Sequence, residues 1–163
     1  MEYPAHAEKS AALAIDPAKL FNALDDHRRL TEHMAKTSLT MGGGKMRLET
    51  DEHGGRVVGS IMRATGTAFG VGISVTEMVV ERDPPRRKVW RTTETPDLIV
   101  IGDYRMGFDI KPADRGVSLT IWIDFAPSSR HRLLSRLLGK AYARWCVDHM
   151  LESAVSVARE DAL

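Results

Sequence analysis

Two polar side chains, Tyr104 and His149, stand at positions where the sequence pattern predicts apolar surroundings. Tyr104 lies between Gly102 and Met106 in a row of alternating apolar residues, so its hydroxyl needs a hydrogen-bond partner inside the protein. His149 follows Trp145 on the helix face that we expect to meet the sheet. The pair could orient a carbonyl or hydroxyl group of an apolar ligand, or act as acid and base. In the plainer alternative, Tyr104 bonds to backbone and His149 is partly exposed.

Apolar side chains complete the predicted ligand-binding site, namely Trp145, Met106, Phe108 and Trp90. Glu77 is a further candidate, because a carboxylate inside an apolar cavity could hydrogen-bond a ligand. However, Ile73 and Val75 share one parity of its strand, whereas Met78 lies on the other. A β-bulge at residues 76–77 would reconcile the two, and it favours a rim or outward position for Glu77. The sequence assigns no catalytic residue.

No metal and no cofactor are predicted. A metal site needs several histidine, cysteine or carboxylate ligands that converge on one point. Cys146 and His149 share a helix face, and His27 and His33 lie in one short predicted helix. Residues of these types on helices are more often packed or exposed than ligands.

Two other motifs are compatible with catalysis but have simpler interpretations. Gly42, Gly43 and Gly44 lack the following Lys-Ser/Thr of a phosphate-binding loop, so we expect a turn. Ser128 and Ser129 precede a helix that contains His131, but capping of that helix is the expected role of these serines.

The elements that must position these residues begin with a strand over residues 11–15. Asp16 and Pro17 then combine an N-cap residue with a proline at the first helical position, which predicts a helix. A second short helix carrying Leu30 and Met34 follows.

From residue 45 to residue 125 the apolar period is two, which is typical of strands. We expect a hairpin turn at residues 53–55 into a strand over 56–63, then a loop over 64–70. A turn at residues 83–85 precedes a strand around Trp90. The clearest alternation spans residues 98–110 and 117–125, with one apolar face in each strand.

Everything from about residue 130 to residue 159 can form one helix, and it carries two apolar stripes. Its first half has Leu134, Leu138, Ala141 and Trp145 on one side, whereas Val147, Met150, Leu151, Ala154 and Val157 point nearly opposite. A straight helix buries one stripe against its own sheet. The other must be covered by the short helices, by a kink or by a second subunit, which makes a homodimer possible.

Composition narrows the classes of function. The 163 residues are 43% hydrophobic, so we expect a single domain over residues 1–163. Their net charge is only +1, so we expect no strong electrostatic field that would attract nucleic acid or a membrane. The one cysteine, Cys146, excludes an internal disulfide and suits the cytoplasm. Residues 1–10 lack the apolar run of a signal peptide, and no segment approaches a membrane span, so we expect no stable membrane insertion.

Basic residues repeat along the predicted C-terminal helix at Arg132, Arg136, Lys140 and Arg144. This stripe is either a solvated helix face, which we favour, or a surface for an acidic partner or anionic lipid. Interleaved aromatic residues that would stack on bases are missing, so nucleic acid is not expected as a partner.

The order of elements predicts an α+β fold: a curved antiparallel sheet of about seven strands wrapped around a long C-terminal helix, with two short helices after the first strand. The chain resembles the START-like, Bet v 1-like helix-grip superfamily, also called SRPBCC, and within it the polyketide cyclase/dehydrase-like group. The resemblance rests on four segments of the sequence: Ala14-Ile15-Asp16-Pro17, Thr76 to Glu81 before Asp83-Pro84-Pro85, Tyr104 to Phe108, and Tyr142 to Cys146.

That resemblance implies a deep apolar cavity between the sheet and the C-terminal helix, but it leaves the function open. The first hypothesis is a module that binds a hydrophobic small molecule such as a lipid, isoprenoid or polyketide-like compound. The second is a metal-free enzyme of the cyclase or dehydratase type that uses the same cavity. The third is a protein-interaction or stress-related helper without ligand chemistry.

Overall fold

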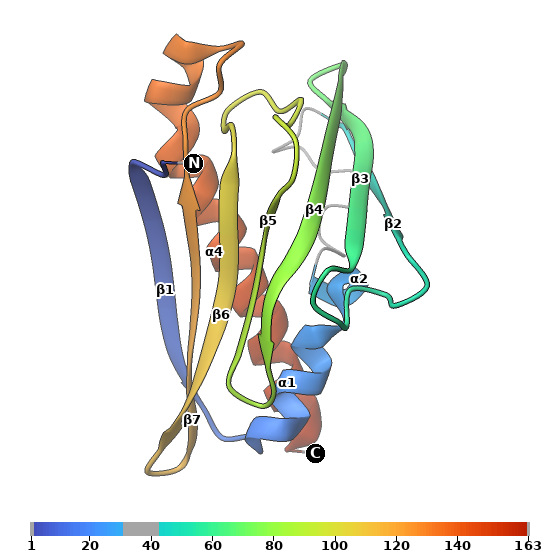
Figure 1. Ribbon diagram of the computed structural model, residues 1–163. Helices are drawn as coiled ribbons and strands as arrows, with labels where there is room; N and C mark the ends of the chain where they lie inside the picture. The colour runs from blue at the N-terminus through green and yellow to red at the C-terminus, as the bar shows by residue number, and fades with distance from the viewer. Residues whose placement is uncertain (1, 31–42, 163) are drawn as a thin grey trace.

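The computed structural model describes residues 2–30 and 43–162, and its centre is a seven-stranded antiparallel sheet (Figure 1). The strands follow the order β1-β7-β6-β5-β4-β3-β2. Their bounds are β1 Ala5–Leu13, β2 Met46–Thr50, β3 Ile61–Ala68, β4 Val71–Asp83, β5 Arg87–Thr92, β6 Tyr104–Ala113 and β7 Gly116–Phe125. The helices are α1 Pro17–Asp25, α2 His27–Leu30 and the long α4 Arg132–Asp161.

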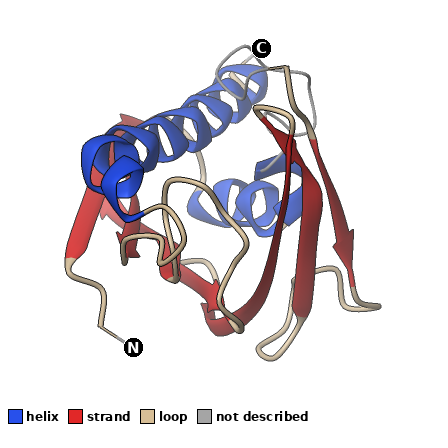
Figure 2. Ribbon diagram, turned by 90° about the horizontal axis from the view of Figure 1, so that it is seen from above, coloured by secondary structure: helices blue, strands red, loops and turns tan. Residues whose placement is uncertain are grey.

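The sheet bends around the helices, as the view from above shows (Figure 2). α4 runs diagonally across its concave side and contacts β1, β7 and α1. This arrangement is the predicted helix-grip fold, including the two short helices after the first strand. Among the described residues, no helix combines the length and apolarity that a membrane span requires.

The transition from β1 to α1 follows the predicted chemistry. The carboxylate of Asp16 accepts hydrogen bonds from the backbone amides of Ala18 and Lys19, and Pro17 occupies the first turn. β1 is longer than the predicted strand at residues 11–15, because it pairs with β7 from Ala5 onward. α2 is described as far as Leu30, and the predicted continuation to Met34 lies outside the described residues.

Several predicted strand limits are wrong. Residues 56–60 form turns rather than the start of a strand, while residues 64–68, predicted as a loop, continue β3 in register with β4. The long strand expected from residue 98 begins at Tyr104. Gly102 explains part of this difference, because its backbone amide bonds to the carbonyl of Ala126 and a Cβ there would meet the Pro127 carbonyl at 2.7 Å.

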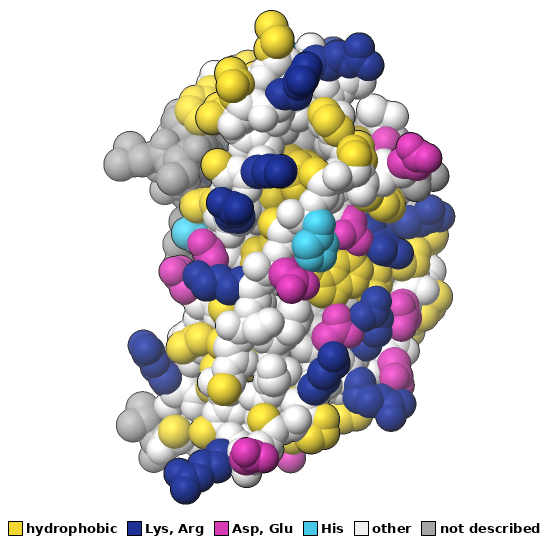
Figure 3. All heavy atoms as spheres, turned by 90° about the vertical axis from the view of Figure 1, so that its left-hand side faces the viewer, with side chains coloured by type: hydrophobic (Ala, Val, Ile, Leu, Met, Phe, Trp, Pro, Cys, Tyr) yellow, Lys and Arg dark blue, Asp and Glu magenta, His cyan; other side chains and the backbone are white. Residues whose placement is uncertain are grey.

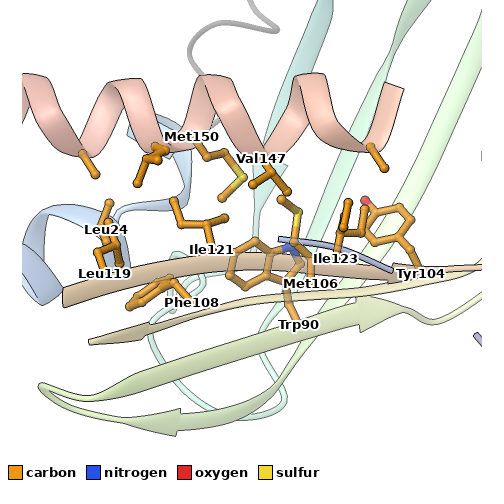
Figure 4. Packing of buried hydrophobic residues seen from close by; sticks show 14 of the residues in the cluster. Leu24, Trp90, Tyr104, Met106, Phe108, Leu119, Ile121, Ile123, Val147 and Met150 are labelled. Carbon is orange, nitrogen blue, oxygen red and sulfur yellow. The ribbon is translucent and has the colours of Figure 1, made fainter. Parts of the chain in front are cut away.

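One apolar core joins the inner face of the sheet to the second half of α4 (Figure 4). The inner residues of β6 and β7 occupy every second position, as predicted: Tyr104, Met106, Phe108, Ile110, Leu119, Ile121 and Ile123. Val147, Met150, Leu151 and Ala154 of α4 pack against them and against Leu24 of α1.

The first half of α4 meets the sheet with a different face from the predicted one. Its buried residues are the small Ser135, Gly139 and Ala143, whereas Leu134 and Leu138 are exposed. A Cβ at Gly139 would lie 3.2 Å from the Val100 carbonyl oxygen, so small residues permit the close approach of helix and chain.

The serines before α4 do not cap it. The residue at the N-cap is His131, without a side-chain cap, and the hydroxyl of Ser128 donates to the Leu98 carbonyl instead. Ser135 ties the same region together, since its hydroxyl donates to the Val100 carbonyl and accepts from the Ser128 amide.

Candidate ligand-binding site

A cavity of about 660 Å³ lies between the inner face of the sheet and α4. This volume falls within the usual range for small-molecule sites. Most of its wall is apolar, with these residues from the sheet, the loop before β6 and the helix: Met46, Leu48, Ala64, Val75, Trp90, Leu98, Ile101, Met106, Ile123 and Met150.

Three polar side chains from separate elements meet in the wall of this cavity. The hydroxyl of Tyr104 on β6 donates a short hydrogen bond to Oε1 of Glu77 on β4. Nε2 of His27, on α2, lies 3.3 Å from the other carboxyl oxygen, where the tautomer protonated on Nε2 donates. The imidazole also packs edge-on against Trp90, with ring centroids 4.9 Å apart. Glu77 is therefore a buried carboxylate held from two sides.

Glu77 points inward because every second residue of β4 from Ile73 to Val79 faces the inner side of the sheet. Ile73, Val75, Glu77 and Val79 are all buried, so the bulge predicted at residues 76–77 is absent there. The register shift occurs later, between Val79 and Glu81 against β5. The expectation that Glu77 occupies a rim or outward position is therefore wrong.

Two further polar groups, Tyr142 and Cys146 of α4, line the cavity and share a side-chain hydrogen bond. Burial raises the pKa of the Cys146 thiol to about 12. Burial, reinforced by the Glu77 carboxylate, also raises the pKa of Tyr104 well above its usual value. Near neutral pH both groups are protonated, so Tyr104 is a hydrogen-bond donor and Cys146 is a poor nucleophile.

The six residues proposed to bind ligand are distributed over three places. Tyr104, Met106 and Trp90 line the cavity. Phe108 is fully buried below it, edge-on to Phe21 of α1.

Trp145 and His149 lie on a side of α4 away from the main cavity, with ring centroids 4.6 Å apart and ring planes tilted by 41°. The His149 side chain is 35% exposed, and its Nδ1 lies 4.0 Å from Glu152. The structure therefore does not bring His149 and Tyr104 together.

Sequence reasoning missed His27 and Tyr142 as cavity residues, and it considered Cys146 only as a metal ligand. If the alternation of Ile73 and Val75 is continued by two residues, it predicts that the side chain of Glu77 faces the cavity. No comparable signal exists for His27, which is 50 residues from Glu77 and reaches it only through the packing of α2 on the sheet.

A second, smaller pocket of about 290 Å³ adjoins the cavity. It lies between the β3–β4 turn, residues 98–100 and α4, and it shares Leu98 and Tyr142 with the main cavity. Trp145 contributes to this pocket. Among residues 2–30 and 43–162, no group of three His, Cys, Asp or Glu side chains is arranged to hold a metal ion.

The family model for "Polyketide cyclase / dehydrase and lipid transport" matches residues 4–158, and the chain belongs to this family. No curated protein shows a significant sequence match.

Solved structures show the same fold at low identity. The ZhuI aromatase/cyclase from Streptomyces sp. R1128 superposes with a TM-score of 0.72 at 14% identity, over 98% of this chain and 96% of that one. The di-domain ARO/CYC StfQ of the steffimycin biosynthetic pathway gives 0.69 at 15% identity, over 96% of this chain and 52% of the other. Ara h 8.0201 gives 0.63 at 16% identity, over 93% and 98%.

The raised thiol pKa predicts how stability depends on alkaline pH. Between pH 9.0 and about 12 the unfolded chain loses the Cys146 proton while the folded chain keeps it. The thiol's contribution is therefore complete below that window and is lost as pH rises through it, at about 1.4 kcal/mol per pH unit. Urea unfolding at about pH 8 to 11 should show a steeper decline for the wild type than for Cys146→Ala. Parallel declines would contradict this assignment.

Proposed function

We propose that the protein binds an elongated apolar small molecule with one hydroxyl or phenol group, which hydrogen-bonds to Glu77. The observation that carries this proposal is a buried carboxylate in the wall of an otherwise apolar cavity of about 660 Å³. A lipid, an isoprenoid or a polyketide-like compound has this combination of a long apolar body and few polar groups. The apolar wall supplies affinity, and the polar cluster supplies orientation.

The hydrogen-bonding capacity of Glu77 supports a ligand that donates. An ionised carboxylate has about four lone-pair sites. Tyr104 donates to one oxygen, and His27 lies within hydrogen-bond distance of the other. A ligand hydroxyl can occupy a further site, and such a charge-assisted hydrogen bond is about twice as strong as a neutral one.

A cyclase or dehydratase activity is the second candidate, and the same cluster favours it. Glu77 can accept a proton from a ligand carbon or hydroxyl, and neutral Tyr104 can donate to a ligand oxygen. The cavity would hold the reactive chain in a folded conformation. This chemistry needs both groups within reach of one ligand, and their direct contact provides that.

Glu77→Gln tests the binding role with a defined probe. We expect a long-chain alcohol, measured by displacement of the neutral dye N-phenyl-1-naphthylamine, to lose about tenfold or more in affinity because a charge-assisted hydrogen bond is lost. The alkane of equal length should bind equally to both proteins. Tyr104→Phe should also weaken the alcohol, since it disturbs the position of the carboxylate.

Two variants control for unspecific effects. Glu81→Gln changes an exposed carboxylate on the same strand, and His149→Ala changes a residue outside the cavity lining. Both should bind the alcohol like the wild type. If Glu77→Gln also leaves the affinity for the alcohol unchanged, the carboxylate has a structural role and the proposed orientation is wrong.

A further inference from the structure

The first half of α4 exposes an unusual amount of apolar surface. Four leucines, which we call the leucine face, are exposed there: Leu133, Leu134, Leu137 and Leu138. The two most exposed, Leu133 and Leu137, are 78% and 79% accessible. Single exposed leucines are ordinary, but four within six residues form a contiguous patch of the kind that marks an interaction site.

A second element extends this patch. The β3–β4 turn lies at the same end of the molecule as the start of α4 (Figure 1). At this turn Phe69 is 65% exposed, and Val71 beside it is also exposed. The smaller pocket connects the two elements, because Phe69 and Leu138 both line it. The apolar surface therefore spans the end of the molecule from the helix to the hairpin.

The charges beside the leucine face have one sign. Arg132, Arg136, Lys140 and Arg144 follow each other at intervals of four, on a stripe of exposed positions next to Leu133 and Leu137. The sequence contains no aspartate or glutamate from residue 125 to residue 147. The space-filling view shows apolar and basic side chains together at this end (Figure 3).

Acidic groups reach this end from the loop between β5 and β6. Asp97, in the loop between β5 and β6, forms an ion pair with Arg130, and Glu94 of the same loop is exposed. The basic stripe from Arg132 to Arg144 is exposed along the helix itself, between the buried face and the leucine face. The surface therefore combines protruding apolar side chains with a row of cations.

We propose that this end of the protein docks peripherally on an anionic lipid bilayer. The leucine face and Phe69 would enter the boundary between headgroups and acyl chains, while the basic stripe contacts the anionic headgroups. A second copy of the chain fits less well, because a two-fold contact through the same face would place the two basic stripes against each other.

Docking would also give the ligand a route. The smaller pocket opens among the apolar residues of this end and shares Leu98 and Tyr142 with the main cavity. If the proposed ligand-binding function holds, an apolar molecule could pass from the bilayer to the cavity along these residues. Docking itself does not depend on that function, since it needs only the surface.

Flotation of the purified full chain with vesicles tests the proposal. We expect binding to vesicles of equal parts phosphatidylcholine and phosphatidylglycerol, and much weaker binding to pure phosphatidylcholine. Leu133→Ser/Leu137→Ser should reduce the partition coefficient at least about tenfold, because the two leucines that would enter the bilayer are lost. Arg136→Glu/Lys140→Glu should reduce it at least as much, since each cation near an anionic surface contributes about a factor of five.

Matched controls lie elsewhere on the surface. Val58→Ser changes an exposed apolar residue near the opposite end of β3, and Arg63→Glu/Arg91→Glu reverses two exposed charges on the outer face of the sheet. Both controls should float like the wild type. The proposal is overturned if the wild type does not float with the anionic vesicles. It is also overturned if Arg136→Glu/Lys140→Glu binds them as well as Arg63→Glu/Arg91→Glu does. Sedimentation that shows a dimer broken by Leu133→Ser/Leu137→Ser would also overturn it, in favour of a second copy.

Discussion

Asp25→Asn is expected to lower the free energy of unfolding by about 3–5 kcal/mol, because it leaves a buried lysine without its counter-ion. Lys88 on β5 is fully buried, and its Nζ lies 2.9 Å from Oδ1 of Asp25 at the end of α1. Arg82 on β4 forms a second ion pair with the same carboxylate at 2.8 Å. The three residues fasten α1 to the sheet at the end of the core opposite the start of α4.

The pKa directions agree with this arrangement. Burial would raise the pKa of Asp25, but Arg82 and Lys88 outweigh it and lower the pKa below its usual value. Burial lowers the pKa of Lys88, and Asp25 opposes that shift.

Equilibrium urea unfolding measures the effect of Asp25→Asn. Adding Lys88→Met to Asp25→Asn should recover part of the loss, since it removes the uncompensated charge. Asp16→Ala, at the other end of the same helix, is the matched control and should cost only about 1 kcal/mol. A loss below about 1 kcal/mol for Asp25→Asn would mean that water or rearrangement solvates Lys88.

Filling the cavity by Ala64→Trp is expected to weaken apolar ligands by about a hundredfold while the fold is retained. Ala64 lies on the inner face of β3 and lines the cavity. An indole at this position occupies space that the ligand would otherwise fill, so the ligand buries less apolar surface. The free energy of unfolding should stay the same or increase, because an open cavity becomes occupied.

Arg63→Trp provides the control for the cavity variant. It adds the same side chain at the neighbouring position of β3, where successive side chains point to opposite faces. Arg63 is exposed on the outer face of the sheet. This variant should therefore bind N-phenyl-1-naphthylamine like the wild type. Equal affinity of Ala64→Trp and Arg63→Trp would show that the dye binds elsewhere.

The sequence predicts the fold well where a capping motif marks the start of an element or where apolar residues alternate regularly. Asp16 and Pro17 specify the start of α1 through capping and a fixed backbone angle, and the structure shows the capping bonds. The alternation in β6 and β7 places Met106 and Ile123 on the inner face as predicted. Strand limits were less accurate, because close backbone contacts such as those at Gly102 depend on neighbours that are distant in sequence.

Hydrophobicity alone predicts the wrong buried face for the first half of α4. In its first half the helix approaches the backbone near Val100 so closely that Ser135, Gly139 and Ala143 fit and leucines do not. Leu134 and Leu138 are consequently displaced to the outside. The same error placed His149 on the sheet-facing side, although it lies beside Trp145 on another side of the helix.

The polar cluster could be predicted only in part. Tyr104 was identified because its alternation is regular and a buried hydroxyl needs a partner. The partner, Glu77, is not predicted to lie inside, because the apolar Met78 suggests a bulge at residues 76–77. In the structure Met78 is half-buried on the outer face of the sheet, and no bulge is needed. His27 enters the site through tertiary packing alone.

Native mass spectrometry of the wild type and of Ala64→Trp tests the central claim that this cavity holds an apolar small molecule. We expect the wild type to carry, or to take up from an excess of a long-chain alcohol, one noncovalent molecule that is lost on denaturation. Ala64→Trp should lack it, and Arg63→Trp should retain it. Absence of any bound molecule in the wild type, even with excess alcohol, would contradict the account and favour a helper protein without ligand chemistry.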